Sequence, residues 1–226
     1  MERITYTTED GTRIVGSYFE GVGERGAILL HMMRADRTSF DLLAKALQGE
    51  GFDVLAIDLR GHGESVRNLG GLTLDYRDFT DEELQDSRLD VVGARDYLEK
   101  KGITLESIAI GGASFGANIA LDFMADNQET TAGFLLSPGL EYHGLETLPL
   151  IERLGEEQAI YIAAAKDDMG KNNARAFEEA EELHKHLRGE RELRIFETGG
   201  HGTDILLAHP ELPNEIAGWL DAAMLL

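Results

Sequence analysis

The most reactive pattern in the sequence is a serine between glycines, in the segment GASFG at residues 112–116. An apolar run of strand length, residues 107–111, precedes this segment, and the helix-compatible run ANIALDFM follows it. Where a strand turns directly into a helix, glycines two residues before and after a serine avoid collisions and leave its hydroxyl exposed. The helix that begins at Phe115 also points free N–H groups and the positive end of its dipole at this hydroxyl. The pattern therefore predicts Ser114 as a nucleophile, and the alternative is an idle serine between loop glycines.

A serine hydroxyl is a weak nucleophile, so it needs a base within hydrogen-bonding reach and a third group that orients the base. His201 is the best base because it lies in the glycine-rich segment ETGGHG, directly after the last predicted strand. The other histidines fit less well, since His184 and His186 lie on a charged predicted helix and His209 precedes a proline. We therefore predict His201 as the base, with a packing role as the alternative.

The orienting acid should follow another strand end, and Asp167 and Asp168 both follow the strand predicted at residues 159–165. Either carboxylate can reach the predicted base, His201. The pattern small-x-x-Asp, in which Ala165 takes the small position, favours Asp168 for the orienting role in a triad. The predicted triad runs along the chain in the order serine, acid, histidine, which differs from the order in chymotrypsin and subtilisin.

Attack of a serine on a carbonyl carbon places negative charge on the carbonyl oxygen, and two backbone N–H groups should meet that charge. The N–H of Phe115 is one predicted donor. The second should come from the loop HMMR after an apolar strand, with Met33 as the first choice and Met32 as the second. Together these groups predict acyl transfer through an acyl-enzyme, a reaction that requires no metal ion and no organic cofactor.

The elements that must position these side chains alternate along the chain. Residues 4–7 and 13–19 predict an antiparallel hairpin around the turn at Glu9-Asp10-Gly11. Crossovers of a dozen or more residues then separate the strands, as a mostly parallel, doubly wound α/β sheet requires. Strands are predicted at residues 27–31, 54–58, 107–111, 132–136, 159–165 and 193–196, and helices at 39–49, where Ser39 is the cap, 81–101, 115–126, 174–187 and 212–224.

Length and composition fit one soluble domain. The chain has 226 residues, 42% of them hydrophobic and 28% charged, which predicts a single globular domain over residues 1–226. Its lack of cysteine excludes disulfides, zinc-thiolate sites and cysteine nucleophiles. The N-terminus has no apolar core of a signal peptide and no stretch is long enough to cross a bilayer, so a cytoplasmic protein is expected.

The chain is strongly acidic. Its 42 acidic and 21 basic residues give a net charge of -21, which repels nucleic acid and anionic membrane surfaces. Neither is an expected partner, and a small-molecule ester is the expected one. The excess acid favours solubility, with adaptation to high salt as the alternative. The sequence makes no prediction of the oligomeric state.

From about residue 13 to residue 223 the chain resembles the α/β-hydrolase superfamily, in particular small lidless carboxylesterases and dienelactone-hydrolase-like members. His31 after an apolar strand is similar to the HG segment of that superfamily, and AIDLRGHGES at residues 56–65 resembles its D-x-R-G-H-G-x-S segment. The resemblance implies that Asp58, His62 and Ser65 are structural. Two departures stand out, a Met at position 32 where the superfamily usually has Gly, and a serine at position 114 where dienelactone hydrolases have cysteine.

The resemblance also implies a fold without a large cap domain. Caps of this superfamily usually follow the strand predicted at 132–136, and residues 137–158 leave room only for a loop and a short helix. The implied function is the hydrolysis of small or short-chain carboxylic esters. A thioesterase or acyltransferase with the same triad is the alternative, followed by a non-catalytic hydrolase-fold binding protein. An apolar acyl slot is predicted from Met32, Met33, Phe115, Tyr142, Leu145 and Met169.

Overall fold

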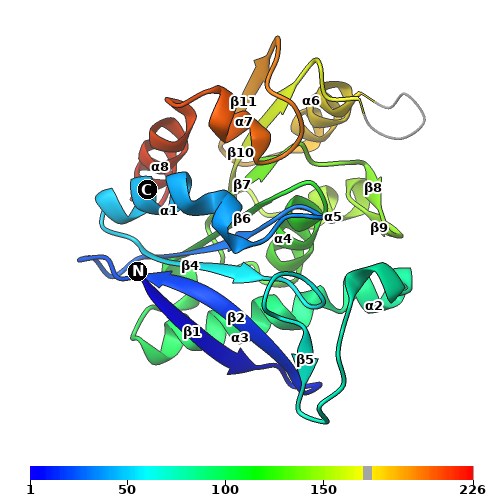
Figure 1. The fold of residues 1–226 in the computed structure, drawn as a ribbon. Coiled ribbons are helices and arrows are strands. Elements are labelled where there is room, and N and C mark those ends of the chain that lie inside the picture. Colours follow the sequence, from blue (N-terminus) through cyan, green and yellow to red (C-terminus); the bar gives the residue numbers. More distant parts are fainter. Residues whose placement is uncertain (170–174, 226) are drawn as a thin grey trace.

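A mixed β-sheet forms the centre of the protein (Figure 1). The computed structural model describes residues 1–169 and 175–225. The strand order is β1-β2-β4-β3-β6-β7-β10-β11, with β5 paired to β2. Strands β1, β2 and β4 pair antiparallel and the rest of this path is parallel, which confirms the predicted sheet with an N-terminal antiparallel hairpin. The strands are β1 (Glu2–Thr7), β2 (Thr12–Phe19), β3 (Gly26–Leu30), β4 (Asp53–Asp58), β5 (Arg67–Asn68), β6 (Ile108–Ala113), β7 (Ala132–Leu136), β10 (Ala159–Ala165) and β11 (Arg191–Phe196).

Helices cover both faces of the sheet, so the central parallel strands are buried on both sides. In β3, for example, Ile28 and Leu30 pack into one core, and Ala27 and Leu29 pack into the other. On one face α1 and α8 lie side by side (Figure 1). That face carries α1 (Asp41–Gly49), α7 (Asp204–Ala208) and α8 (Leu212–Ala223), and the other carries α3 (Ser87–Lys100), α4 (Phe115–Asp126), α5 (Leu148–Arg153) and α6 (Ala176–His186).

Two predicted helices differ from the structure in their beginnings or continuity. The helix predicted at 81–101 is two helices, α2 (Asp81–Gln85) and α3, which meet at Asp86. Aspartate disfavours helix interiors because its carboxylate competes for nearby backbone groups. The helix predicted to begin at Ser39 is preceded by a 3-10 turn, η1 (Arg37–Phe40), whose cap is Asp36. The predicted helix 174–187 corresponds to α6, and its first residue, Ala174, lies outside the described residues.

The segment between β7 and β10 holds a short hairpin and one short helix, as expected for a fold without a large cap domain. The hairpin consists of β8 (Glu141–Tyr142) and β9 (Leu145–Glu146), which pair antiparallel. Strands of two residues are too short to show the alternation that predicts a strand, so this hairpin was not predictable from the sequence. None of the helices in the described part of the chain has the length and apolar character that crossing a membrane requires.

A buried ion pair ties the loop after β4 to α3. Arg60 is 5% exposed and Asp90 is fully buried. The guanidinium donates two hydrogen bonds of 3.0 and 2.9 Å to Oδ1 of Asp90, and the backbone N–H of Arg60 donates to Oδ2 at 2.9 Å. Burial raises the pKa of Asp90 to about 6, against the opposing effect of the guanidinium. The buried carboxylate of Asp90 therefore depends on Arg60, which also forms an ion pair of 2.8 Å with the exposed Asp10.

We expect Asp90→Ala to lower the free energy of unfolding by about 3 kcal/mol, because the buried guanidinium of Arg60 then keeps only its ion pair with the exposed Asp10. Urea denaturation measures this change. Asp96→Ala is the matched control, since Asp96 pairs with Arg95 on the same helix but is half-exposed. Its loss should stay below about 1 kcal/mol. Equal losses in the two variants would contradict a larger contribution of the buried Arg60–Asp90 pair to the free energy of unfolding.

Candidate active site

Ser114 lies at a sharp turn between β6 and α4. Its φ of 53° and ψ of -122° are in a region that residues with a side chain seldom adopt, and such strain costs about 1–3 kcal/mol. Two hydrogen bonds hold the turn: the N–H of Ser114 donates to the Leu136 carbonyl at 2.8 Å, and its own carbonyl accepts from Ala117 at 2.9 Å. The geometry is that of a nucleophile elbow.

The glycines around Ser114 are required by close packing. A Cβ atom on Gly112 would collide with the backbone of Gly116, and one on Gly116 would collide with the carbonyl oxygen of Leu30. The first turn of α4 therefore lies directly against the end of β3. As a result, the loop after β3 begins beside Ser114, which is the place expected for the predicted second oxyanion donor.

His201 and Asp168 form a hydrogen bond of 2.8 Å between Nδ1 and Oδ2. They follow β11 and β10, which are neighbours in the sheet. Asp168 is 5% exposed, whereas the imidazole is 37% exposed. An ionised carboxylate can only accept a hydrogen bond, so Nδ1 carries the proton and Nε2 is left as an acceptor. This is the tautomer that a general base needs.

Asp167 points elsewhere. Its Oδ1 accepts hydrogen bonds from the N–H groups of Gly199 and Gly200, at 3.0 and 3.1 Å. The two neighbouring aspartates thus have different partners. Asp168 contacts the imidazole of His201, and Asp167 anchors the backbone of the loop that carries His201.

Ser137 provides a second anchor for this loop, which the sequence analysis did not identify. It is buried, has a φ of 46°, and its Oγ accepts a hydrogen bond of 3.0 Å from the N–H of Gly202. Its place directly after β7, at the same sheet edge as the other candidate residues, was the available signal. The residue after His201 is therefore fixed to the strand between β6 and β10.

The loop of His201 reaches the nucleophile elbow. A Cβ atom on Gly202 would lie 2.8 Å from Sδ of Met32 and 3.3 Å from Cβ of Ala113, the residue before Ser114. Tyr142 belongs to the same surroundings, since both Ser114 and the carboxylate of Asp168 influence the pKa of its hydroxyl. Burial raises the pKa of Tyr142 to about 12, so its hydroxyl is neutral at pH 7. The sequence predicts Tyr142 only as part of an apolar wall.

The two predicted oxyanion donors are free to act. Phe115 is the first residue of α4, and within the described residues neither its N–H nor that of Met33 donates a hydrogen bond. His31 holds the start of the loop that carries Met33. Its Nδ1 donates to the Met32 carbonyl at 2.8 Å, and its Nε2 accepts from the backbone N–H of Leu59 at 3.0 Å.

The segment after β4 is built around internal hydrogen bonds. Asp58 accepts from the N–H groups of Arg37 and Glu64, at 2.8 and 2.7 Å. Ser65 donates to the carbonyl of Asp58 at 2.7 Å and accepts from Val15 at 2.9 Å. These contacts show that the side chains of Asp58 and Ser65 stabilise the structure of this segment.

Across residues 1–169 and 175–225, no three side chains of the histidine, aspartate or glutamate type gather as metal ligands would.

Residues 25–166, more than half of the chain, match the family described as Serine aminopeptidase, S33. The chain therefore belongs to this family and is a hydrolase of the α/β-hydrolase type. The predicted superfamily and hydrolase class are confirmed. No curated protein sequence matches the chain.

Solved structures share the fold at low sequence identity. An esterase from Pyrococcus furiosus has a TM-score of 0.76 and 19% identity, with 99% of this chain and 90% of that chain covered. A malate-bound thermophilic esterase from Thermogutta terrifontis has a TM-score of 0.75 and 16% identity, with coverage of 99% and 100%. A dienelactone hydrolase from Anabaena variabilis has a TM-score of 0.72 and 17% identity, with 99% of this chain and 96% of that chain covered.

Burial lowers the pKa of both His31 and His62 to about 4. In the unfolded chain histidine titrates near about 6.5, so below this pH the unfolded state binds more protons than the folded state. The free energy of unfolding should therefore be highest above about pH 6.5 and fall toward about pH 4, by up to roughly 1.4 kcal/mol per pH unit for each histidine.

Urea denaturation across this pH range measures the loss, and NMR of the imidazole resonances identifies its source. Both resonances should stay at their neutral positions well below the ordinary pKa of histidine. Titration of either ring near about pH 6.5 would contradict its assignment as a buried neutral group.

Proposed function

We propose that Ser114, Asp168 and His201 are the catalytic triad of a serine esterase that cleaves small or short-chain carboxylic esters. The observation that carries the proposal is the hydrogen bond from His201 to Asp168 at the same sheet edge as the strained elbow of Ser114. Family membership supports the hydrolase class. The esterases among the structures of the same fold favour ester substrates.

In the proposed first step, Nε2 of His201 takes the proton of Ser114, and Oγ attacks the ester carbonyl carbon. The N–H groups of Phe115 and Met33 donate to the oxygen of the tetrahedral intermediate. The negative charge of Asp168 stabilises the imidazolium. His201 then gives its proton to the departing alcohol, and an acyl-enzyme remains on Ser114.

In the second step water attacks the acyl-enzyme. His201 takes a proton from the water, the oxyanion forms again in the same place, and collapse of this intermediate releases the carboxylic acid. The proton returns to Oγ of Ser114. A thioester would follow the same route with a thiol leaving group, and an acyltransferase would replace water by another acceptor.

The surroundings of Ser114 favour a small acyl group. The hairpin β8–β9 lies on one side of the elbow. Tyr142 belongs to the surroundings of Ser114, and the ring of His143 packs edge-on against Phe115 with 5.5 Å between ring centroids. These contacts close one side of the elbow, which supports the proposed preference for short acyl chains.

We expect Ser114→Ala to lower kcat on nitrophenyl acetate by roughly 10⁴-fold or more, since no other hydroxyl replaces the nucleophile. Colorimetric assay of nitrophenyl esters of increasing acyl length measures both the loss and the preference, which should favour short chains. Circular dichroism controls for folding. Wild-type rates in the variant would refute the triad, and faster turnover of aminoacyl nitroanilides than of esters would refute the substrate class.

The neighbouring aspartates offer a matched pair of variants. Asp168→Asn should lower kcat by about 10⁴-fold, because an amide favours the wrong imidazole tautomer. Asp167→Asn should cost less than about tenfold, since its amide oxygen can still accept from the glycine N–H groups. Steady-state kinetics on one ester compares them, and a larger loss in Asp167→Asn would reverse the assignment of the acid.

A further inference from the structure

The end of β7 and the residues after it contact several parts of the candidate site. The N–H of Ser114 donates to the Leu136 carbonyl at 2.8 Å, and the N–H of Gly202, in the loop of the proposed base, donates to Oγ of Ser137 at 3.0 Å. Consecutive Cα atoms are about 3.8 Å apart, so the stretch from Leu136 to Gly139 is about 11 Å long at most. The nucleophile, the loop of the base and Gly139 therefore lie close together.

The ring of Tyr142 packs on Gly139. A Cβ atom on Gly139 would lie 2.5 Å from Cε2 and 2.7 Å from Cζ of Tyr142, the carbon that carries the hydroxyl. Asn118 on α4 holds Gly139 in place, because its Oδ1 accepts from the glycine N–H and its Nδ2 donates to the glycine carbonyl, both at 3.2 Å. Asn118 is fully buried, and its own N–H donates to the Ser114 carbonyl at 3.2 Å. Tyr142 is thus packed on a point that is fixed to the first turn of the nucleophile helix.

The tip of the hairpin β8–β9 is tied to α2 (Figure 1). Nδ1 of His143 lies 2.8 Å from Oδ1 of Asp81, and Nε2 of Gln85 donates to the His143 carbonyl at 2.7 Å. The hairpin is therefore held at its base by α4 and at its tip by α2. Tyr142 lies between these two points, so both sets of contacts fix its position.

The hydroxyl of Tyr142 is available to a substrate. Tyr6, Tyr18 and Tyr161 each donate to a carbonyl or carboxylate oxygen of the protein, at 2.5, 2.6 and 2.8 Å. Among residues 1–169 and 175–225, no carbonyl or carboxylate oxygen accepts from Tyr142 in this way. Its pKa of about 12 keeps the hydroxyl protonated at pH 7. It is therefore a neutral donor in the surroundings of the proposed nucleophile.

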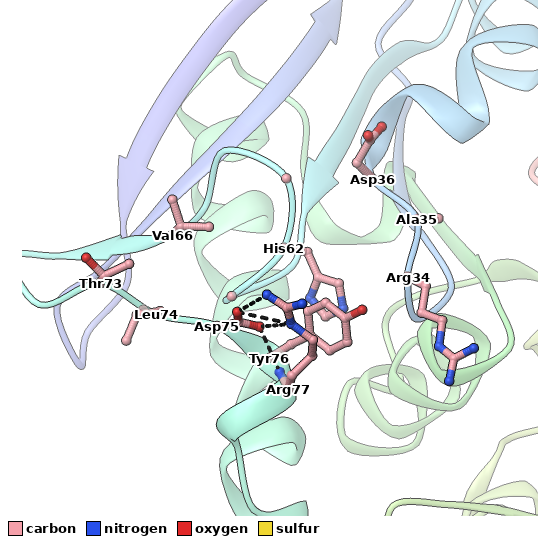
Figure 2. Close-up of a pocket in the computed structure, with 12 residues that line it drawn as sticks. Arg34, Ala35, Asp36, His62, Val66, Thr73, Leu74, Asp75, Tyr76 and Arg77 are labelled. Carbon is pink, nitrogen blue, oxygen red and sulfur yellow. Dashed lines mark hydrogen bonds and ion pairs between the residues drawn. The ribbon is translucent and has the colours of Figure 1, made fainter.

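The hairpin and the loop that carries Met33 lie on opposite sides of Ser114. Strands β3 and β7 are the two neighbours of β6, which leads to Ser114, and Met33 follows β3 whereas Tyr142 follows β7. A cavity of about 440 Å³ between the loops after β3 and β4 is also on the β3 side, and none of the described residues that line it belongs to the triad or to the hairpin (Figure 2). An ester carbonyl oxygen that points at Met33 therefore points away from Tyr142.

The other ester oxygen, the alkoxy oxygen, is then the one on the side of Tyr142. His201 must approach this oxygen in order to protonate the departing alcohol. Asp168 bonds His201 at 2.8 Å and also influences the hydroxyl of Tyr142, so the tyrosine and the base act in the same region. A hydroxyl donates readily to an oxygen atom and only weakly to a sulfur atom. The atom that links the acyl group to its leaving group is therefore what Tyr142 can distinguish.

We propose that Tyr142 donates a hydrogen bond to the alkoxy oxygen of the substrate, so that the site selects oxygen esters over thioesters. The inference rests on the proposed esterase function, and it adds a catalytic residue and the class of substrate. When the C–O bond breaks, its electron pair stays on the alkoxy oxygen and the proton comes from Nε2 of His201. Tyr142 keeps its own proton and stabilises the charge that develops on this oxygen. Asn118 is a positioning residue, because it acts through Gly139.

The test compares ethyl acetate with S-ethyl thioacetate, which differ only in the atom that links the acetyl and ethyl groups. Both give the same acetyl-enzyme, so a difference in kcat/KM arises before that intermediate forms. Tyr142→Phe should lower kcat/KM on ethyl acetate by about tenfold, the scale of one hydrogen bond. On the thioester the loss should stay below about twofold, because sulfur is a weak acceptor. Release of acid in a pH-stat measures both rates.

Tyr97→Phe is the matched control. Tyr97 packs edge-on against Tyr18 with 5.6 Å between ring centroids, and Tyr18 bonds Asp53 at the beginning of β4, the opposite edge of the sheet from Ser114. This variant should change neither rate. Equal losses on the two substrates in Tyr142→Phe, or no loss on ethyl acetate, would overturn the inference and leave the esterase proposal intact. Hydrolysis that survives in Ser114→Ala would instead overturn the proposed function.

A second variant keeps the hydroxyl and moves it. Gly139→Ala places a Cβ atom where Cε2 of Tyr142 lies, so the ring must shift. The folded variant, as verified by circular dichroism, should show the same selective loss on ethyl acetate as Tyr142→Phe. A wild-type ratio of the two rates in folded Gly139→Ala would contradict the placement of the hydroxyl by Gly139. Tyr142→Phe leaves the packing of the ring in place and decides the role of the hydroxyl on its own.

Discussion

The candidate site depends on the close approach of two backbones, where Gly116 at the start of α4 lies against the carbonyl oxygen of Leu30 at the end of β3. This approach leaves no space for a Cβ atom. It brings the first turn of α4, with its free N–H groups, beside the loop that begins at His31. The left-handed φ of Ser114 follows from the same packing, because the chain must leave β6 and enter α4 within a single residue.

The loops around this point are held by polar side chains that hydrogen-bond to backbone atoms. His31 bonds the Met32 carbonyl and the Leu59 N–H, Ser137 bonds Gly202, and Asp167 bonds the glycines before His201. His31 and Ser137 are buried, so breaking one of their bonds leaves a buried polar group without a partner. His62 is the exception, because its buried Nε2 has no partner within the described residues.

Elements with many residues were predictable and short ones were not. The strands that helices cover on both sides form continuous apolar runs, and β7 and β10 have the bounds that these runs predicted. The hairpin β8–β9 depends on contacts with other parts of the chain, such as the 2.8 Å hydrogen bond between His143 and Asp81. A pattern of neighbours in sequence contains no information about such contacts.

The sequence by itself determined the succession of the longer strands and helices along the chain. It also identified the serine between glycines and the sheet edge at which the candidate residues gather. These features follow from local periodicity and from the rule that parallel strands end on one edge. Only the tertiary structure decided which aspartate meets His201, because Asp167 and Asp168 are adjacent and equal in chemistry. It also decided the role of Ser137, since that role depends on Gly202, a partner far away along the chain.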